Sequence, residues 1–155
     1  MSYIIGMNLT DIDATAEFTL GGIGQTDDGK LYKYVQYEAA TAAVAGVAGE
    51  VAYYATVAVG DATATIVTSD LSDSDAVGAG VLQAALTDGT FGWVQVAGVA
   101  TLTIALTAGA DGDALTPTGA GDGTLDVNIA TAANTDVCAR AVDASANIIL
   151  CAFTH

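Results

Sequence analysis

Hydrophobic and polar side chains alternate along short stretches of the chain from residue 30 onward. In KLYKYVQYE, at 30–38, Tyr32, Tyr34 and Gln36 fall on one side of an extended chain and the residues between them on the other. This period of two is that of a β-strand, and the TDDG just before it favours a turn. On the same grounds we predict strands in EVAYYATVAV (50–59), ATATIVTSD (62–70), AGVLQAAL (79–86), FGWVQV (91–96), VATLTIAL (99–106), VCARAV (137–142) and IILCAF (148–153).

The stretch TFGWVQVAGVATLTIALTAG, at 90–109, has no charged side chain and is long enough for a membrane-spanning helix. It also contains several threonines and glycines, and polar groups are costly in hydrocarbon. Its apolar residues alternate on both sides of Gly98, and many of them are β-formers. We therefore interpret this stretch as two adjacent strands and not as a membrane span.

The spacing of strands and turns predicts the fold class. About eight to ten short strands, with turn signals about every ten residues, are typical of a β-sandwich or barrel. We interpret 70–78 as a loop, whereas 39–49 leaves a short helix open because alanine favours a helix and its two glycines oppose it. We expect one compact, mainly β domain over residues 30–155, with at most one short helix. Residues 1–29 are predicted to form an extended N-terminal arm and the first turn.

The charge of the chain excludes some partners. Eighteen Asp and Glu stand against three Lys and Arg, so the net charge is −15. Three scattered cations build no basic patch, which excludes nucleic acid and anionic membrane surfaces as partners. Nearly all the acids are Asp beside Gly, Ser or Thr, which is typical of turns between strands. The first residues show no signal peptide, so we expect synthesis in a cytoplasm.

The titratable and nucleophilic residues indicate no catalytic site. The single histidine is His155, at the chain end, so Ser-His-Asp and Cys-His arrangements are absent. Cys138 and Cys151 are expected to be two small buried side chains of a terminal hairpin. A cross-strand disulfide is the alternative; if Val142 pairs with Ile148, Cys138 faces Ala152 and the thiols point to opposite faces. We predict no metal, no cofactor and no enzymatic activity.

The Asp-rich loops are candidate calcium sites. Asp73, Asp75 and Gly78 have the spacing of the first half of an EF-hand loop, but Val77 and Ala84 stand where further ligands belong. Weak calcium binding stays open at a second group of carboxylates, Asp111, Asp113 and Asp122. The default interpretation of all these loops is a set of solvated turns.

Several quoted segments together resemble the capsid decoration (cement, head-stabilising) proteins of tailed bacteriophages. They are DDGKLYKYVQY, AGEVAYYA, VTSDLSDSDAVGAGVLQAAL, GTFGWVQVAGVATLTIALTAGADGDALTPTGAGDGTLDV and VCARAVDASANIILCAF. The resemblance extends from about residue 18 to the end and rests on the order and spacing of the motifs. It implies a small β-rich, β-tulip-type, non-enzymatic protein on the outside of the expanded head. Such proteins assemble as trimers at three-fold and quasi-three-fold positions and clamp the major capsid protein.

The resemblance also implies contact residues. An N-terminal arm would engage the capsid through its apolar side chains, Tyr3, Ile4, Ile5, Leu9, Phe18 and Leu20. Aromatic residues of the domain are predicted to form the homotrimer interface, namely Tyr53, Tyr54 and Trp93. Trp93 is interpreted as a core or interface residue in preference to a platform for a sugar. The implied location is the outer capsid surface of the virion, after synthesis in the host cytoplasm.

A different class of protein shares this composition. Secreted or surface β-modules of halophilic or marine microbes, such as adhesins or calcium-dependent carbohydrate-binding domains, are also acidic and rich in Gly, Thr and Asp. The lack of a signal peptide and of aromatic platforms disfavours this alternative.

Overall fold

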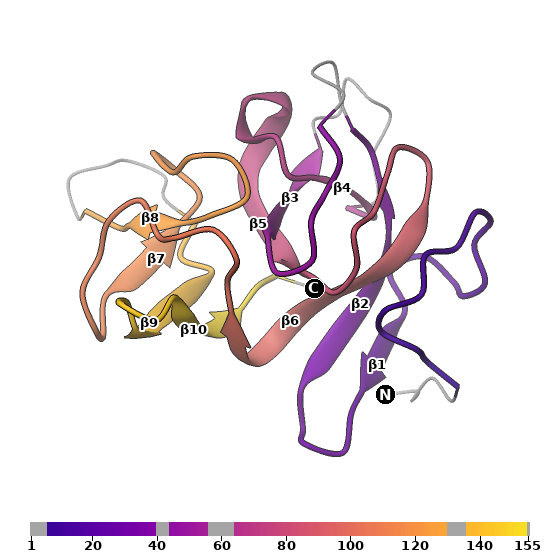
Figure 1. Ribbon diagram of the computed structural model, residues 1–155, viewed down its shortest axis with the longest axis horizontal. Coiled ribbons are helices and arrows are strands. Elements are labelled where there is room, and N and C mark those ends of the chain that lie inside the picture. The colour runs from indigo at the N-terminus through magenta and orange to yellow at the C-terminus, as the bar shows by residue number, and fades with distance from the viewer. Residues whose placement is uncertain (1–5, 40–43, 56–63, 130–135, 155) are drawn as a thin grey trace.

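The computed structural model describes residues 6–39, 44–55, 64–129 and 136–154, and the fold is mainly β, as the alternation predicts (Figure 1). These residues form ten strands and one short 3-10 turn, with no α-helix among them. The strands are β1 (Ile23–Gln25), β2 (Leu31–Tyr37), β3 (Val51–Ala55), β4 (Ile66–Thr68), β5 (Ser74–Leu82), β6 (Phe91–Thr101), β7 (Ala114–Thr116), β8 (Asp126–Val127), β9 (Ala139–Asp143) and β10 (Ile148–Ala152).

Five of the strands close into a small barrel. The pairings run β2–β4–β3–β5–β6 and return from β6 to β2, and only β2 and β4 are parallel. Tyr34 pairs with Trp93 across β2 and β6. Residues of β2 alternate between the two faces, so Val35 and Tyr37 enter the core while Tyr32 and Tyr34 lie on the other face of the sheet. The predicted barrel-like architecture is confirmed.

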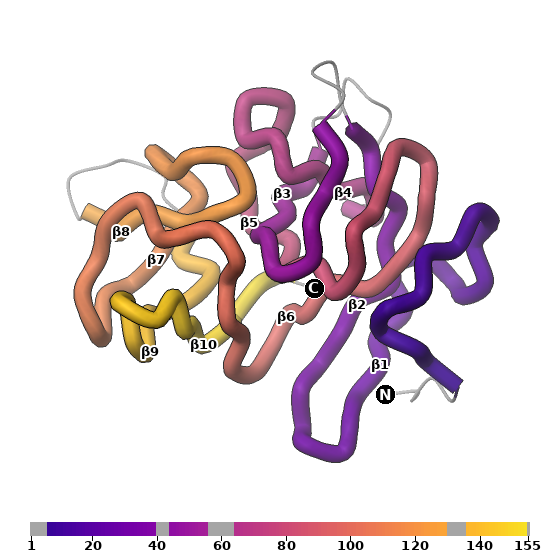
Figure 2. Tube along the Cα trace, in the orientation of Figure 1, coloured from indigo at the N-terminus to yellow at the C-terminus, as the bar shows by residue number. Residues whose placement is uncertain are grey.

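Strand β6 extends beyond the barrel and begins a second group of strands. Its residues 97–101 pair with β10, which is followed by β9, β7 and β8 (Figures 1 and 2). The prediction of two strands separated at Gly98 is wrong, because one strand passes through this residue with φ at +94°. Glycine tolerates this backbone conformation without the steric penalty that other residues meet. Gly98 therefore bends the strand and does not end it.

Some element boundaries differ from the prediction. The segment 70–78 was expected to be a loop, yet β5 begins at Ser74, after a 3-10 turn at Leu71–Asp73 that the Asp70 side chain caps. Residues 44–49 form no helix, and 40–43 lie outside the described residues. The same holds for 56–59 of the predicted strand 50–59 and for 62–63 of the predicted strand 62–70. In the part of the chain that is described, no helix is long and apolar enough to span a membrane.

The terminal hairpin forms as predicted. Strands β9 and β10 pair so that Cys151 lies opposite Ala139, and the amide N–H of Ala152 donates to the Cys138 carbonyl. A bulge between Ile148 and the next residue leads to this register. Both cysteines are free and buried, which confirms the expectation of two small core side chains.

Candidate functional site

An aromatic cluster lies on the outer face of the barrel, where β2 and β6 pair. The rings of Tyr34 and Trp93 are 5.0 Å apart between centroids, and Phe91 stacks on Tyr34 at 6.4 Å. Phe18 from the N-terminal segment packs at 5.3 Å from both Tyr34 and Trp93. Aromatic pairs of this kind each contribute about 0.5–1.5 kcal/mol beyond the area they bury. The cluster therefore holds the N-terminal segment against the sheet.

We call residues 6–22 the N-terminal strap, because they cross this cluster outside the barrel (the indigo segment in Figure 2). Asp13 and Phe91 exchange backbone hydrogen bonds at 3.0 and 2.9 Å. The Tyr34 hydroxyl donates to the Asp13 carboxylate and accepts the Glu17 amide N–H at 3.2 Å. The described part of the predicted arm is thus folded onto the barrel and is not extended, since its apolar residues find an aromatic surface on their own chain.

The environment of Tyr34 changes its acidity. Burial raises the pKa of the Tyr34 hydroxyl to about 12, and the bond to the Asp13 carboxylate adds to the increase. Both causes favour the neutral hydroxyl, because an ionised phenolate would be desolvated and would face a carboxylate. Tyr34 is therefore a neutral hydrogen-bond donor that holds the strap at neutral pH.

The predicted capsid-contact residues divide into two groups. Tyr3, Ile4 and Ile5 lie outside the described residues. Leu9, Phe18 and Leu20 are half-buried and pack against the aromatic cluster, so they anchor the strap. The large apolar strap residue that is exposed to a partner is Ile12, with 49% of its surface accessible. Sequence analysis missed Ile12, because nothing in the local pattern separates an anchoring apolar residue from an exposed one.

The structure corrects the expectation for the three predicted interface aromatics. Tyr53, Tyr54 and Trp93 expose 0%, 7% and 1% of their surfaces, so they have almost none to offer a partner. Tyr53 reaches into the core, where its hydroxyl accepts the amide N–H of Thr124 at 2.9 Å. The other interpretation of Trp93, as a core residue, agrees with its burial. Trp93 lies opposite Tyr34 because β2 and β6 pair. Only the folded chain shows that the strap covers both side chains.

One of the three cations is internal. Lys33 is 6% exposed; its ammonium donates to the Tyr54 hydroxyl at 2.9 Å and to the Ala64 carbonyl at 2.8 Å, and lies 4.9 Å from the centre of the Tyr54 ring. Lys30 and Arg140 are then the only basic side chains on the surface. Glu50 and Asp70 are buried as well, so the exterior keeps the strongly acidic balance of the sequence.

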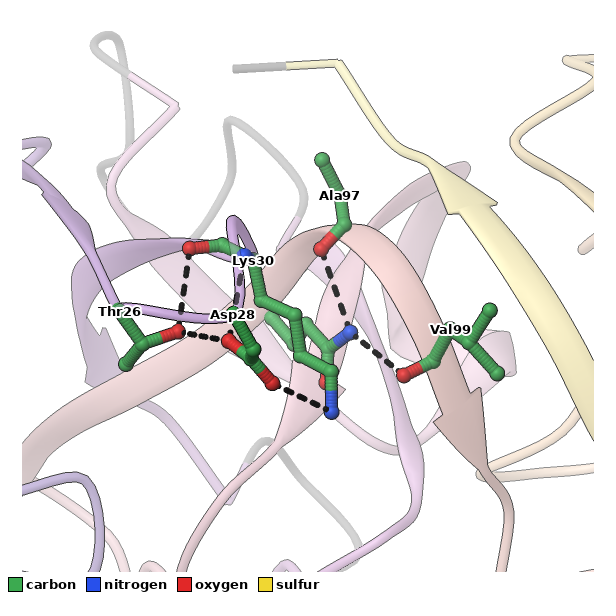
Figure 3. A network of polar contacts seen from close by, with 6 residues as sticks. Thr26, Asp28, Lys30, Ala97 and Val99 are labelled. Carbon is green, nitrogen blue, oxygen red and sulfur yellow. Dashed lines mark hydrogen bonds and ion pairs between the residues drawn. The ribbon is translucent and has the colours of Figure 1, made fainter.

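A groove of about 510 Å³ lies beside the bend of β6. On its wall the buried carboxamide of Gln95 donates to the Ala97 carbonyl at 3.2 Å and to the Val99 carbonyl at 3.1 Å (Figure 3). These two carbonyls flank Gly98, where the bend interrupts the regular strand. The Gln95 side chain therefore joins the backbone on the two sides of the bend.

Lys30, the charged residue beside this groove, forms an ion pair within the chain. The Lys30 ammonium lies 3.3 Å from the Asp28 carboxylate, which accepts the Thr26 hydroxyl at 2.5 Å (Figure 3). The Thr26 bond, followed by the bonds from Lys30, lowers the pKa of Asp28. A second groove, of about 590 Å³, lies between this turn and the start of the strap. The polar groups of Figure 3 thus support the turn and the bend, and they form no reactive constellation.

The described residues contain no group of three or more His, Cys, Asp or Glu that could hold a metal ion. The carboxylates considered for calcium cap turns: Asp111, Asp113 and Asp122 accept backbone N–H groups of Ala144, Ala110 and Leu71, respectively. Asp75 and Gly78 lie within β5 and not in a calcium loop. Burial raises the pKa of both thiols, that of Cys151 to about 12, so they stay protonated at neutral pH. His155 lies outside the described residues.

Comparison with models of known protein families, with curated proteins and with solved structures finds no match for this chain. Its function is therefore argued from its own residues and geometry.

Proposed function

We propose that this chain is an outer-capsid decoration protein of a tailed bacteriophage. It would bind the expanded head as trimers at three-fold and quasi-three-fold positions and stabilise the major capsid protein against internal DNA pressure. The resemblance of the sequence to this class motivates the proposal. The proposed role is structural and non-enzymatic, and it takes place on the virion surface after synthesis in the host cytoplasm.

The observation that carries the proposal is the N-terminal strap. Asp13, Phe18 and their partners hold it in one position, while Ile12, next to Asp13, and residues 14–17, between the two anchors, are exposed. A surface segment that is already ordered loses little conformational entropy on binding. The strap therefore suits repeated docking on a regular lattice, and Ile12 is its apolar contact.

Charge supports the same role. A chain with net charge −15 and two surface cations repels DNA, which an outer-surface protein never needs to contact. Binding to the expanded lattice and not to its disrupted form would stabilise the shell by mass action. Several modest contacts per trimer would add up, because each trimer bridges several capsid subunits.

The test is co-sedimentation of the purified chain with expanded heads of the parent phage that lack it. Bound copies are counted by quantitative mass spectrometry. We expect saturable binding in multiples of three per site on expanded heads and none on unexpanded proheads. Absence of binding at micromolar protein would overturn the proposal.

A matched pair of variants tests the role of the strap. Ile12→Asp places a charge at the proposed contact, and Val47→Asp places the same charge at a residue with the same exposure, 49%, outside the strap. Ile12→Asp is expected to weaken capsid binding at least about 10-fold, because a carboxylate would be desolvated at the contact. Val47→Asp should bind as the unmodified chain does; equal loss in both variants would contradict the assignment.

A further inference from the structure

The outer face of the second group of strands carries a row of apolar side chains. Cross-strand partners share a face, and the register Val99–Leu150–Arg140–Ala114 runs from β6 through β10 and β9 to β7. Val99 and Leu150 expose 46% and 45% of their surfaces. These side chains lie on solvated strands at one end of the molecule, away from the strap (Figure 1).

The centre of this face lacks acidic side chains. Its remaining described positions are apolar or neutral: Ala97, Thr101, Val142, Ile148 and Ala152. Acidic residues lie at its rim, at Asp143, the last residue of β9, at Asp126 in the edge strand β8, and at Asp111 and Asp113 in the loop beside β9. In a chain with net charge −15, a four-strand surface whose carboxylates lie only at its rim stands out from the remainder of the exterior.

The one charged side chain of the face is a cation without an acidic partner. The Arg140 guanidinium donates to the Gly112 carbonyl at 3.2 Å, and no described carboxylate lies within ion-pair distance of it. A guanidinium has five N–H donors in a fork that matches a carboxylate. Arg140 is therefore able to bind a carboxylate from another molecule.

We infer that this face is where a second copy of the chain docks, and we name Val99, Val142, Leu150 and Arg140 its self-association face. Two copies with net charge −15 repel each other, and the repulsion is smallest where neither presents an acid. The same chain also supplies the carboxylates that Arg140 lacks, at the rim positions Asp113 and Asp143. An apolar centre with a charged rim is the usual composition of a protein interface.

The size of the face indicates reversible association. Four strands about 4.8 Å apart, each with about five residues rising about 3.3 Å, cover on the order of 250 Å². A standard interface buries about 800 Å² per partner. The face is thus the centre of a contact that also needs the neighbouring loops, and we expect its occupancy to depend on concentration. The location of the face is argued independently of the proposed function. Only the expected number of copies, three, rests on that proposal.

The experiment is sedimentation velocity of the purified chain from low micromolar to about 1 mM, without capsids. We expect a 15.3 kDa species at low concentration and a larger one at high concentration. Leu150→Asp should raise the association Kd at least about 10-fold, because it removes half-exposed apolar surface and adds a like charge. Arg140→Glu should do the same and is the second variant if Leu150→Asp fails to fold by circular dichroism.

The matched control is Val47→Asp, which adds the same charge at a similarly exposed residue outside both the face and the strap and should associate as the unmodified chain does. A single 15.3 kDa species at every concentration would overturn the inference, as would association that survives both Leu150→Asp and Arg140→Glu. A monomeric chain whose capsid binding is lost on Leu150→Asp would assign the face to the capsid protein instead. Because association is measured without capsids, its failure and a failure of capsid binding are distinguishable.

Discussion

Phe18 is the side chain on which the strap most depends, so we predict that Phe18→Ala opens the strap and leaves the barrel folded. The ring is half-buried and contacts Tyr34 and Trp93, each at 5.3 Å between centroids. Two aromatic contacts contribute about 1–3 kcal/mol, and burial of roughly half a Phe side chain adds about 1 kcal/mol. The strap should therefore be destabilised by about 2–4 kcal/mol. Even the lower value raises its open population roughly 30-fold.

Trp93 provides the assay, because it is the only tryptophan and lies beneath Phe18 at 1% exposure. In Phe18→Ala, acrylamide should quench its fluorescence more strongly, and amide hydrogen exchange should accelerate across residues 10–22. Exchange in β3 should change little, since β3 pairs with β4 and β5 and with neither β2 nor β6. Ile12→Ala is the control within the strap. Unchanged quenching and exchange in Phe18→Ala would refute the reasoning.

Four further predictions concern other sites. Gly98→Ala should destabilise the chain by about 1–3 kcal/mol in urea titration, because φ is +94° and the added Cβ would lie 2.8 Å from Lys30 Cγ. The stabilisation from neutral Tyr34 should be complete below pH 10 and lost as the pH rises from 10 to about 12; this loss should be smaller in Tyr34→Phe. The thiols of Cys138 and Cys151 should resist alkylation at pH 8 until urea unfolds the chain. Calcium and a chelator should leave the Tm unchanged, because backbone N–H groups occupy the turn carboxylates.

Local patterns predicted the parts of the fold that depend on neighbours in sequence. The alternation of residues 30–38 is one example, because a strand with one face in the core places every second side chain there whatever lies beyond it. The terminal hairpin is another, since two apolar runs joined by a short polar turn pair with each other. The acidic, turn-rich composition likewise indicated a mainly β chain before any contact was known.

What the pattern did not determine depends on residues far apart in the chain. Gly98 resembles a strand terminator locally, yet pairing with β10 continues β6 through it. The hydrogen bond between Tyr34 and Asp13 joins residues 21 positions apart, and no local signal separates a strap from an extended arm.

Composition and alternation therefore determined that the chain would be an acidic β protein, because these properties follow from the side chains themselves. Only the tertiary structure decided which apolar residues lie inside it. It buried Tyr53 and Trp93, which the sequence suggested as contacts, and left Ile12 and Leu150 exposed. The physical reason is that exposure is set by what packs over a residue, and distant segments do that packing.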